Sequence, residues 1–261
     1  MIKAYQSGEL FIEENKTLLE QNKYLATFFY FDAPLIKEVD INNYMIKVEQ
    51  TGSILLALRL DPYNLLLLGD ASCLDELLSY LKKGKFKDTE ILCPTEMGDI
   101  LVKKYNYQID KGLDFMETRE ITSPSSVEVE IPSLEDVDEL YTLMLNFLID
   151  CEITDNIDKA KVIKLIDSFR VIKKNGQIIS MARFGYGTED SDRISYVYTR
   201  PEFRGLGYAR KVVNTVKNEI IQSGRIATLN VDQLNPISNH IYTSLGFRKV
   251  FSQGVYRLKD N

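Results

Sequence analysis

The sequence predicts a mixed α/β (α+β) fold, in which a mostly antiparallel sheet is flanked by helices and two similar domains follow one another. A length of 261 residues fits two domains better than one. The hydrophobic fraction of 44% and the charged fraction of 27% are those of a folded protein. Each half shows the same order of patterns: three strands, a helix, a strand, a helix and a strand. This order indicates an ancient duplication, although convergence on a common α/β pattern explains it as well.

The elements of the first half follow from alternation, apolar runs and helical periodicity. Thr51-Gly52 marks a hairpin turn between two alternating segments. We expect strands at 44–49, 53–60, 64–68, 90–93 and 113–120, and helices at 74–82 and 96–105.

The second half has clearer boundaries. Ser133 precedes two acidic residues, which is typical of a helix start. Lys174-Asn175-Gly176 marks a hairpin turn, and Gly224 and Gly246 end helices. We expect strands at 127–131, 169–173, 177–186, 193–199, 226–231 and 248–258, and helices at 134–148, 157–168, 207–223 and 236–244.

A Ser/Pro cluster at 121–126 separates the two halves. We therefore expect an N-terminal domain at 1–123 and a C-terminal domain at 124–261. Residues 1–124 contain 14 Lys and Arg against 20 Asp and Glu, so the net charge of −6 lies there, and the remaining residues contain 18 of each. An acidic surface attracts cationic substrates or simply aids solubility.

Composition excludes several classes of protein. The net charge of −6 argues against nucleic-acid binding. The longest apolar run, 63–68, is too short for a membrane helix, and the first 30 residues lack a basic signal-peptide region. Cys73, Cys93, Cys151 and the single His240 match no metal-ligand spacing or disulfide framework, so we expect no metal and a cytoplasmic location.

The segment 197–210, Val-Tyr-Thr-Arg-Pro-Glu-Phe-Arg-Gly-Leu-Gly-Tyr-Ala-Arg, carries the main functional signal. A strand ends, Pro201 stops the pairing, and a turn with Gly205 and Gly207 opens a helix. Glycines let the backbone approach a ligand, and the first amides of a helix bind anions such as pyrophosphate. Arg204, Arg210 and Lys211 add positive charge. The pattern lacks the acidic residue of a Rossmann site and the Gly-Lys-Ser/Thr of a P-loop. Alone, it also fits a tight strand-to-helix connection.

Two motifs together resemble the GCN5-related N-acetyltransferase (GNAT) family. Arg204-Gly205-Leu206-Gly207-Tyr208-Ala209 is similar to the Arg/Gln-x-x-Gly-x-Gly/Ala signature of that family. Asn235, then Ile241-Tyr242, then Leu245-Gly246-Phe247 is similar to its late motif, with Asn235 and Tyr242 at the usual spacing. The resemblance covers about 127–258. The first half lacks the signature, since Gly69-Asp70 follows its buried strand, and we expect it to be a degenerate GNAT-like domain.

The resemblance implies acetyl-CoA (coenzyme A) as the cofactor. The backbone of the strand end would pair with the pantetheine arm, the turn would hold the pyrophosphate, and an Asn would touch the arm. The implied cofactor-binding residues are Val197, Tyr198, Thr199, Arg204, Gly205, Leu206, Gly207, Tyr208, Ala209, Arg210 and Asn235. Asn235 before Pro236 also fits a helix cap.

The resemblance makes Tyr242 the catalytic residue, as a general acid for the departing thiolate, because a phenol is protonated at neutral pH. The base is left open: Asn230 stands where some relatives carry a Glu, and Asp232, Glu202 or a water chain are the alternatives. His240 points away from Tyr242 around a helix. We expect Cys151 to pack as a small apolar residue.

The resemblance therefore implies an acetyl-CoA-dependent N-acyltransferase that transfers acetyl directly to a small-molecule or peptide amine in a ternary complex. We expect a monomer or homodimer that binds neither nucleic acid nor a membrane. A non-catalytic acyl-CoA sensor or interaction protein is one alternative, and an aminoacyl-tRNA-dependent transferase is another.

Overall fold

The computed structural model describes residues 1–185 and 187–259, and the chain divides into two compact units. Unit 1 consists of Met1–Leu113 together with Phe251–Asn261, and unit 2 of Asp114–Val250. Two long strands, β6 (Tyr107–Thr118) and β11 (Arg248–Leu258), contribute residues to both. The units are therefore not two consecutive stretches of the chain, because the last strand returns to the first unit.

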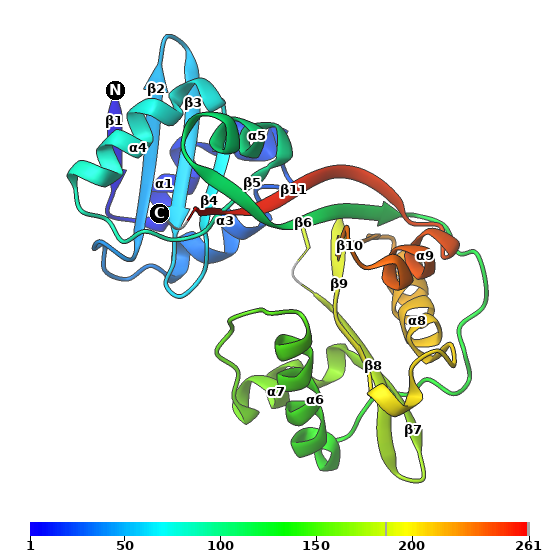
Figure 1. Ribbon diagram of the computed structural model, residues 1–261. Coiled ribbons are helices and arrows are strands. Elements are labelled where there is room, and N and C mark those ends of the chain that lie inside the picture. Colours follow the sequence, from blue (N-terminus) through cyan, green and yellow to red (C-terminus); the bar gives the residue numbers. More distant parts are fainter. Residues whose placement is uncertain (186, 260–261) are drawn as a thin grey trace. The chain divides into compact units, whose positions relative to one another are not determined.

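The sheet of unit 1 is mainly antiparallel (Figure 1). Its strands are β1 (Ile2–Tyr5), β2 (Tyr44–Gln50), β3 (Ser53–Arg59), β4 (Leu65–Gly69) and β5 (Ile91–Pro94). The first four run antiparallel in that order, β4 and β5 are parallel, and β11 pairs antiparallel with β5. The expected strands of this half are present, and β6 begins earlier than its pattern indicated.

Helices cover both faces of this sheet. α4 (Leu74–Lys83) and α5 (Thr95–Lys104) bury one apolar cluster, and α1 (Gly8–Glu14), α2 (Lys16–Gln21) and α3 (Thr27–Asp32) bury another. The run Leu65–Leu68 is apolar at every position because alternate side chains enter opposite clusters.

The sheet of unit 2 has the strands β7 (Phe169–Lys174), β8 (Gln177–Gly185), β9 (Ser191–Thr199) and β10 (Ile226–Asp232). β7, β8 and β9 are antiparallel neighbours, β10 runs parallel to β9, and β6 follows β10 in the strand order. With the flanking helices, this arrangement confirms the expected mixed, mostly antiparallel α/β fold.

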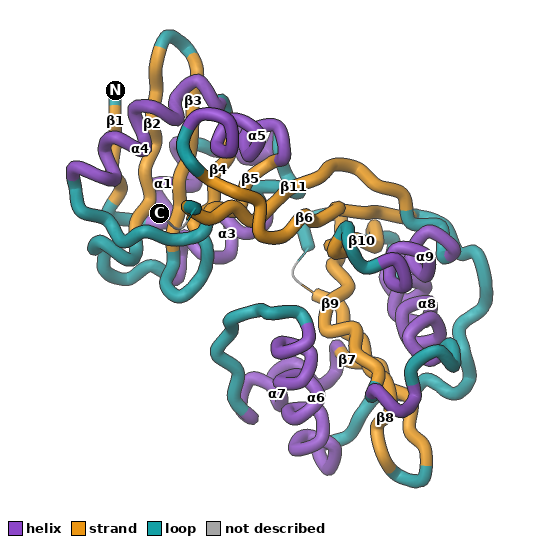
Figure 2. The backbone as a smooth tube through the Cα atoms, viewed as in Figure 1, coloured by secondary structure: helices purple, strands orange, loops and turns teal. Residues whose placement is uncertain are grey.

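Helices also lie on both sides of the strands of unit 2 (Figure 2). α6 (Val137–Asp150) and α7 (Lys159–Leu165) pack on one apolar cluster, while α8 (Tyr208–Gln222) and α9 (Pro236–Ser244) pack on the other. The loop between α6 and α7 and the start of α8 are thereby placed around β9.

The Ser/Pro segment lies inside unit 2 and covers the polar side of α8. The amide of Asn214 donates to the carbonyl of Pro124 at 2.8 Å, and Asn218 donates to the carbonyl of Ser123 at 2.8 Å. Lys217 has no exposed surface, and its ammonium donates to Thr122 Oγ1 at 3.0 Å and to a carbonyl at the end of α9. These bonds explain how polar residues of α8 are buried.

Three expectations need comment. The segment 127–131 was expected to be a strand, but it contributes only a single bridge from Glu130 to Val171, and Val127 is fully exposed. Residues 1–43 form β1 and three short helices that no sequence pattern indicated. Tyr186, the expected last residue of β8, lies outside the described residues.

Candidate active site

The turn between β9 and α8 has the backbone conformation that glycine favours. Gly205 has φ 76° and Gly207 has φ 83°, both in the left-handed region. A Cβ atom added at either position meets no atom within 4 Å. The turn therefore needs glycine at both positions for its left-handed backbone conformation, and the space beside that backbone is open.

The N-terminus of α8 offers donors for an anion. Gly207 is the N-cap residue, no side chain accepts a hydrogen bond at this cap, and the first turn contains no acidic residue. The first amides of a helix have no partner within the helix, and the helix dipole adds positive potential there. The start of this 15-residue helix therefore has the free amide donors and the positive potential that a phosphate site requires.

The nearby cations are held by other parts of unit 2. Arg204 donates to the carbonyl of Thr199 at 3.0 Å and to Asp150 Oδ2 at 2.5 Å. Arg210 donates to the hydroxyl of Ser244. Arg204 therefore ties the turn to the end of β9, as well as bringing charge to it.

The strand β9 is irregular beyond Arg193, where its pairing with β10 ends and its pairing with β8 shifts register. Its pairing with β8 shifts register between Met181 and Arg183, and Tyr196 at this bulge has φ 50°. Its parallel pairing with β10 covers Ser191–Arg193, opposite Ile226–Thr228. In the described residues no pairing of these two strands is found beyond that point. The backbone of Tyr198 and Thr199 therefore pairs with β8 on one side and, within the described residues, has no pairing with β10 on the other, where Arg204 donates to the carbonyl of Thr199.

The remaining predicted turn residues differ in exposure. Leu206 is 60% exposed, whereas Tyr208 is buried beneath the turn and Tyr198 and Thr199 are buried on β9. The ring of Tyr208 lies 5.0 Å from the ammonium of Lys174 and contacts Phe203 edge-on. Ala209 is half-buried in the first turn of α8. The turn therefore presents backbone, Leu206 and the charged side chain of Arg204 to solvent.

Asn235 and Tyr242 lie on α9, at its start and near its end. The side-chain oxygen of Asn235 accepts from the backbone of Ser238 at 3.0 Å, so the expected helix cap is present. Tyr242 is 7% exposed and contacts Phe247 at a ring distance of 6.0 Å. Burial, and secondarily the nearby Cys151 thiol, raise the pKa of Tyr242 above its ordinary value. Its hydroxyl is therefore protonated at neutral pH.

The structure places the remaining sequence candidates as follows. Asp232 accepts from the backbone of Leu234 at 2.8 Å at the end of β10. Glu202 and His240 are exposed. Cys151, expected to be a packed apolar residue, ends α6 half-buried and acts electrostatically on Tyr242.

Sequence reasoning missed a group of three hydrogen-bonded residues on the α6 side of β9. The hydroxyl of Tyr196 donates to Asp155 Oδ2 at 3.0 Å, and Lys161 donates to both oxygens of the same carboxylate at 3.0 and 3.2 Å. No local pattern signals this contact, because it joins residues 41 positions apart and the bulge residue is not a glycine.

The corresponding turn in unit 1 is closed to anions. Asp70 follows β4, where its carboxylate accepts from the backbone of Ser72 at 2.8 Å and from the hydroxyl of Ser53 at 2.8 Å. Both hydrogen bonds lower the pKa of Asp70, and the bond from the backbone of Ser72 has the larger effect. An anionic side chain thus occupies the donors at the start of this helical segment.

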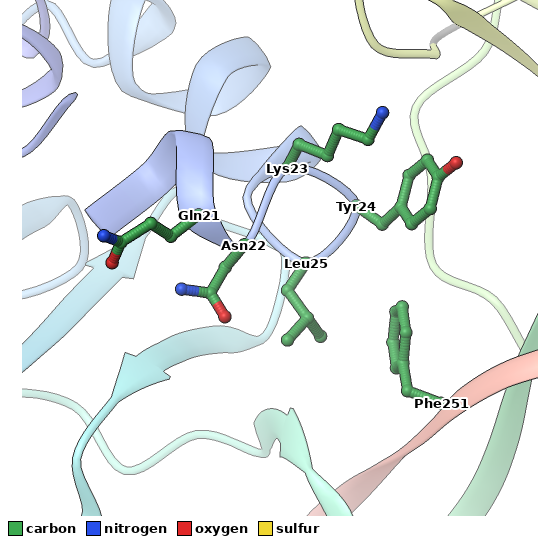
Figure 3. Close-up of a pocket in the computed structure, with 6 residues that line it drawn as sticks. All are labelled: Gln21, Asn22, Lys23, Tyr24, Leu25 and Phe251. Carbon is green, nitrogen blue, oxygen red and sulfur yellow. The ribbon is translucent and has the colours of Figure 1, made fainter. Parts of the chain in front are cut away.

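Other features of the described residues carry no chemistry. A hollow of about 310 Å³ in unit 1 is formed by residues 21–25 and Phe251, none of them a predicted site residue (Figure 3). No group of three or more metal-ligating side chains is found in the described part of the chain. Within that part, too, every helix is either too short or too polar to cross a membrane.

Comparisons with known proteins concern the fold and the family resemblance of the chain. Residues 180–256 match the family described as FR47-like protein, which is GNAT-related. The chain is similar to the GCN5-related N-acetyltransferase from Sphaerobacter thermophilus, with a TM-score of 0.67 and 12% identity over 98% of this chain and 94% of that chain. An acetyltransferase from the GNAT family of Colwellia psychrerythraea gives a TM-score of 0.64 and 12% identity over 99% and 100%.

A putative GNAT acetyltransferase from Novosphingobium aromaticivorans gives a TM-score of 0.51 and 19% identity, covering 78% of this chain and 89% of that chain. No curated protein sequence matches the chain. The resemblance of the C-terminal half to the GNAT family is confirmed, and the fold of the whole chain is that of GNAT acetyltransferases.

Proposed function

We propose that the protein is an acetyl-CoA-dependent N-acetyltransferase that acetylates an amine by direct transfer in a ternary complex. The observation that carries the proposal is the open glycine turn at the uncapped start of α8, directly after the end of β9, where no pairing with β10 is found in the described residues. An extended ligand with a pyrophosphate at one end requires both features.

The residues fit this cofactor in kind and position. The amides from Gly205 through Arg210 would hold the pyrophosphate, because they lie at a helix start without a side-chain acceptor. The backbone of Val197–Thr199, on the side away from β8, would hold the pantetheine arm. The side-chain oxygen of Asn235 is used by the helix cap, so its amide nitrogen is the group that would touch the arm. Acetyl-CoA supplies the acetyl thioester that an amine attacks.

The protein supplies a proton donor at Tyr242. Its raised pKa keeps the proton on the phenol at neutral pH, which suits donation to a departing thiolate with a reference pKa of about 8.5. The acceptor must be neutral when it attacks, and deprotonating an amine of pKa about 10.4 at pH 7.5 costs about 4 kcal/mol. Asp232, Glu202 or a water chain would accept that proton.

Two measurements test the proposal. Acetyl-CoA is expected to raise the thermal midpoint of the protein, and thiol release from acetyl-CoA is expected to increase with at least one member of an amine panel. Binding without amine-dependent thiol release would support the acyl-CoA sensor instead. No thermal shift at millimolar acetyl-CoA would contradict cofactor binding.

We place the enzyme in the cytoplasm, as a monomer or homodimer.

A further inference from the structure

The loop between α6 and α7 reaches two parts of the candidate site. It begins after Asp150 and ends at Asp158, which caps α7 through the backbone of Lys161 at 2.7 Å. At its start, Cys151 acts on the phenol of Tyr242. Four residues later, Asp155 accepts a hydrogen bond from Tyr196, the residue at the bulge of β9. The loop is therefore anchored to β9 through the hydrogen bond between Tyr196 and Asp155, next to Val197–Thr199.

Asp155 is a carboxylate held in a defined position. Its side chain is 14% exposed, and the hydroxyl of Tyr196 donates to it. The ring of Tyr196 packs against Phe147 and Phe169, at centroid distances of 5.1 and 6.3 Å. A carboxylate with so little contact to water requires hydrogen-bond donors and a compensating cation. The phenol of Tyr196 is the rigid donor, and Lys161 supplies the cation.

That cation is a primary ammonium on a flexible stem. Lys161 donates to both oxygens of Asp155 and to the carbonyl of Asn156 at 3.4 Å, and its side chain remains 32% exposed. A free primary amine carries the same ammonium group with the same three donors. The oxygens that accept from Lys161 therefore offer the same acceptors to the ammonium of a free alkylamine.

We propose that Asp155, oriented by Tyr196, binds the ammonium group of the acceptor amine, and that Lys161 occupies this place until the acceptor displaces it. The inference rests on the proposed function, because the acceptor is the amine that function requires. It assigns a primary alkylamine as the substrate class and makes Lys161 an internal competitor. Asp155 binds and positions the acceptor; the base that deprotonates it is a separate group.

The test uses n-butylamine, which reproduces the side chain of lysine. At saturating acetyl-CoA, Asp155→Asn is expected to raise the KM for n-butylamine about tenfold or more, because a hydrogen bond to a charged group is lost. Lys161→Ala is expected to lower this KM by removing the competitor. The matched control is Asp138→Asn, which breaks the exposed ion pair between Asp138 of α6 and Lys159 of α7 (2.7 Å) and is expected to leave KM unchanged.

A second readout does not depend on turnover. In Lys161→Ala, n-butylammonium is expected to raise the thermal midpoint more than in the wild type, and uncharged n-butanol is not. This measurement also serves if Asp155→Asn fails to fold. A purely structural ion pair would give lower stability in both variants, unchanged KM and no selective effect of n-butylammonium, and that result would overturn the inference.

The two proposals fail in different ways. Loss of the acetyl-CoA thermal shift in the wild type would remove the proposed function, while n-butylammonium rescue of Lys161→Ala would still report on the Asp155 site. A normal acetyl-CoA shift in Asp155→Asn with an unchanged KM would overturn the acceptor site alone.

Discussion

Gly207→Trp separates the ligand-binding role of the glycine turn from its conformational role. Gly207 has φ 83°, and its Cβ position is open, so the indole has room but the backbone is strained. The left-handed conformation costs a residue with a Cβ about 1–2 kcal/mol. The bulky side chain lies over the amides at the start of α8 and excludes a pyrophosphate from them. We expect a folded protein of lower stability that no longer binds acetyl-CoA.

The magnitude of the ligand effect sets the assay. A ligand present at 100 times its dissociation constant stabilises the folded state by about 2.7 kcal/mol. For a domain of this size, that free energy raises the thermal midpoint by about 5–10 °C. Differential scanning fluorimetry with and without acetyl-CoA measures this difference directly, and the wild type is expected to show it.

The chain offers a matched control at the opposite end of the same helix. Gly224 has φ 83° and an equally open Cβ position. Gly224→Trp therefore introduces the same strain without touching the proposed phosphate site. It is expected to lower the midpoint about as much as Gly207→Trp while keeping the acetyl-CoA shift. An undiminished shift in Gly207→Trp, or its equal loss in both variants, would refute the reasoning.

Three further predictions concern the rest of unit 2. Tyr242→Phe keeps the ring contact with Phe247 but removes the proton donor, so kcat is expected to fall about a hundredfold or more at unchanged acetyl-CoA affinity; an unchanged kcat would exclude Tyr242 as the acid. Burial, followed by the charge of Arg210, lowers the pKa of Lys217 from 10.5. The unfolded state therefore binds more protons between the folded value and 10.5, and stability rises with pH across that window. Urea unfolding should show this rise in the wild type and not in Lys217→Met; a parallel rise in both would contradict it. Deleting residues 1–123 removes the Asp114–Thr118 part of β6, which belongs to unit 2. We expect that deletion to abolish cooperative unfolding by circular dichroism, and a sharp transition would show that unit 2 does not need β6.

Much of unit 2 could be predicted because local chemistry specifies it. The turn at Asn175-Gly176, the end of α8 at Gly224 and the cap at Asn235 each depend on a residue whose own conformation or side chain sets a boundary. The strand expected at 127–131 failed because alternation requires a neighbouring strand, and only Glu130 makes a bridge. Pattern alone does not say whether a partner is present.

Long-range pairing and strain were beyond the sequence. The pairing of β11 with β5 joins residues about 160 positions apart, and no local signal distinguishes it from pairing nearer in the chain. The bulge at Tyr196 places a non-glycine residue at φ 50°, which only the surrounding structure can impose. The Asp155–Lys161 pair was missed for the same reason, because its position depends on Tyr196.

The two units differ at the start of the helix that follows the buried strand. In unit 1, the carboxylate of Asp70 accepts from the backbone of Ser72 and from Ser53, so a built-in anion takes the donors that a phosphate would need. In unit 2, Gly207 leaves the equivalent helix without a side-chain cap, and a Cβ there would meet no atom. A second anion would have to displace Asp70 against like charge, whereas in the described part of the chain no side chain caps the helix that begins after Gly207. One pyrophosphate site per chain is therefore what the two turns predict, and it belongs to the unit that also carries Tyr242.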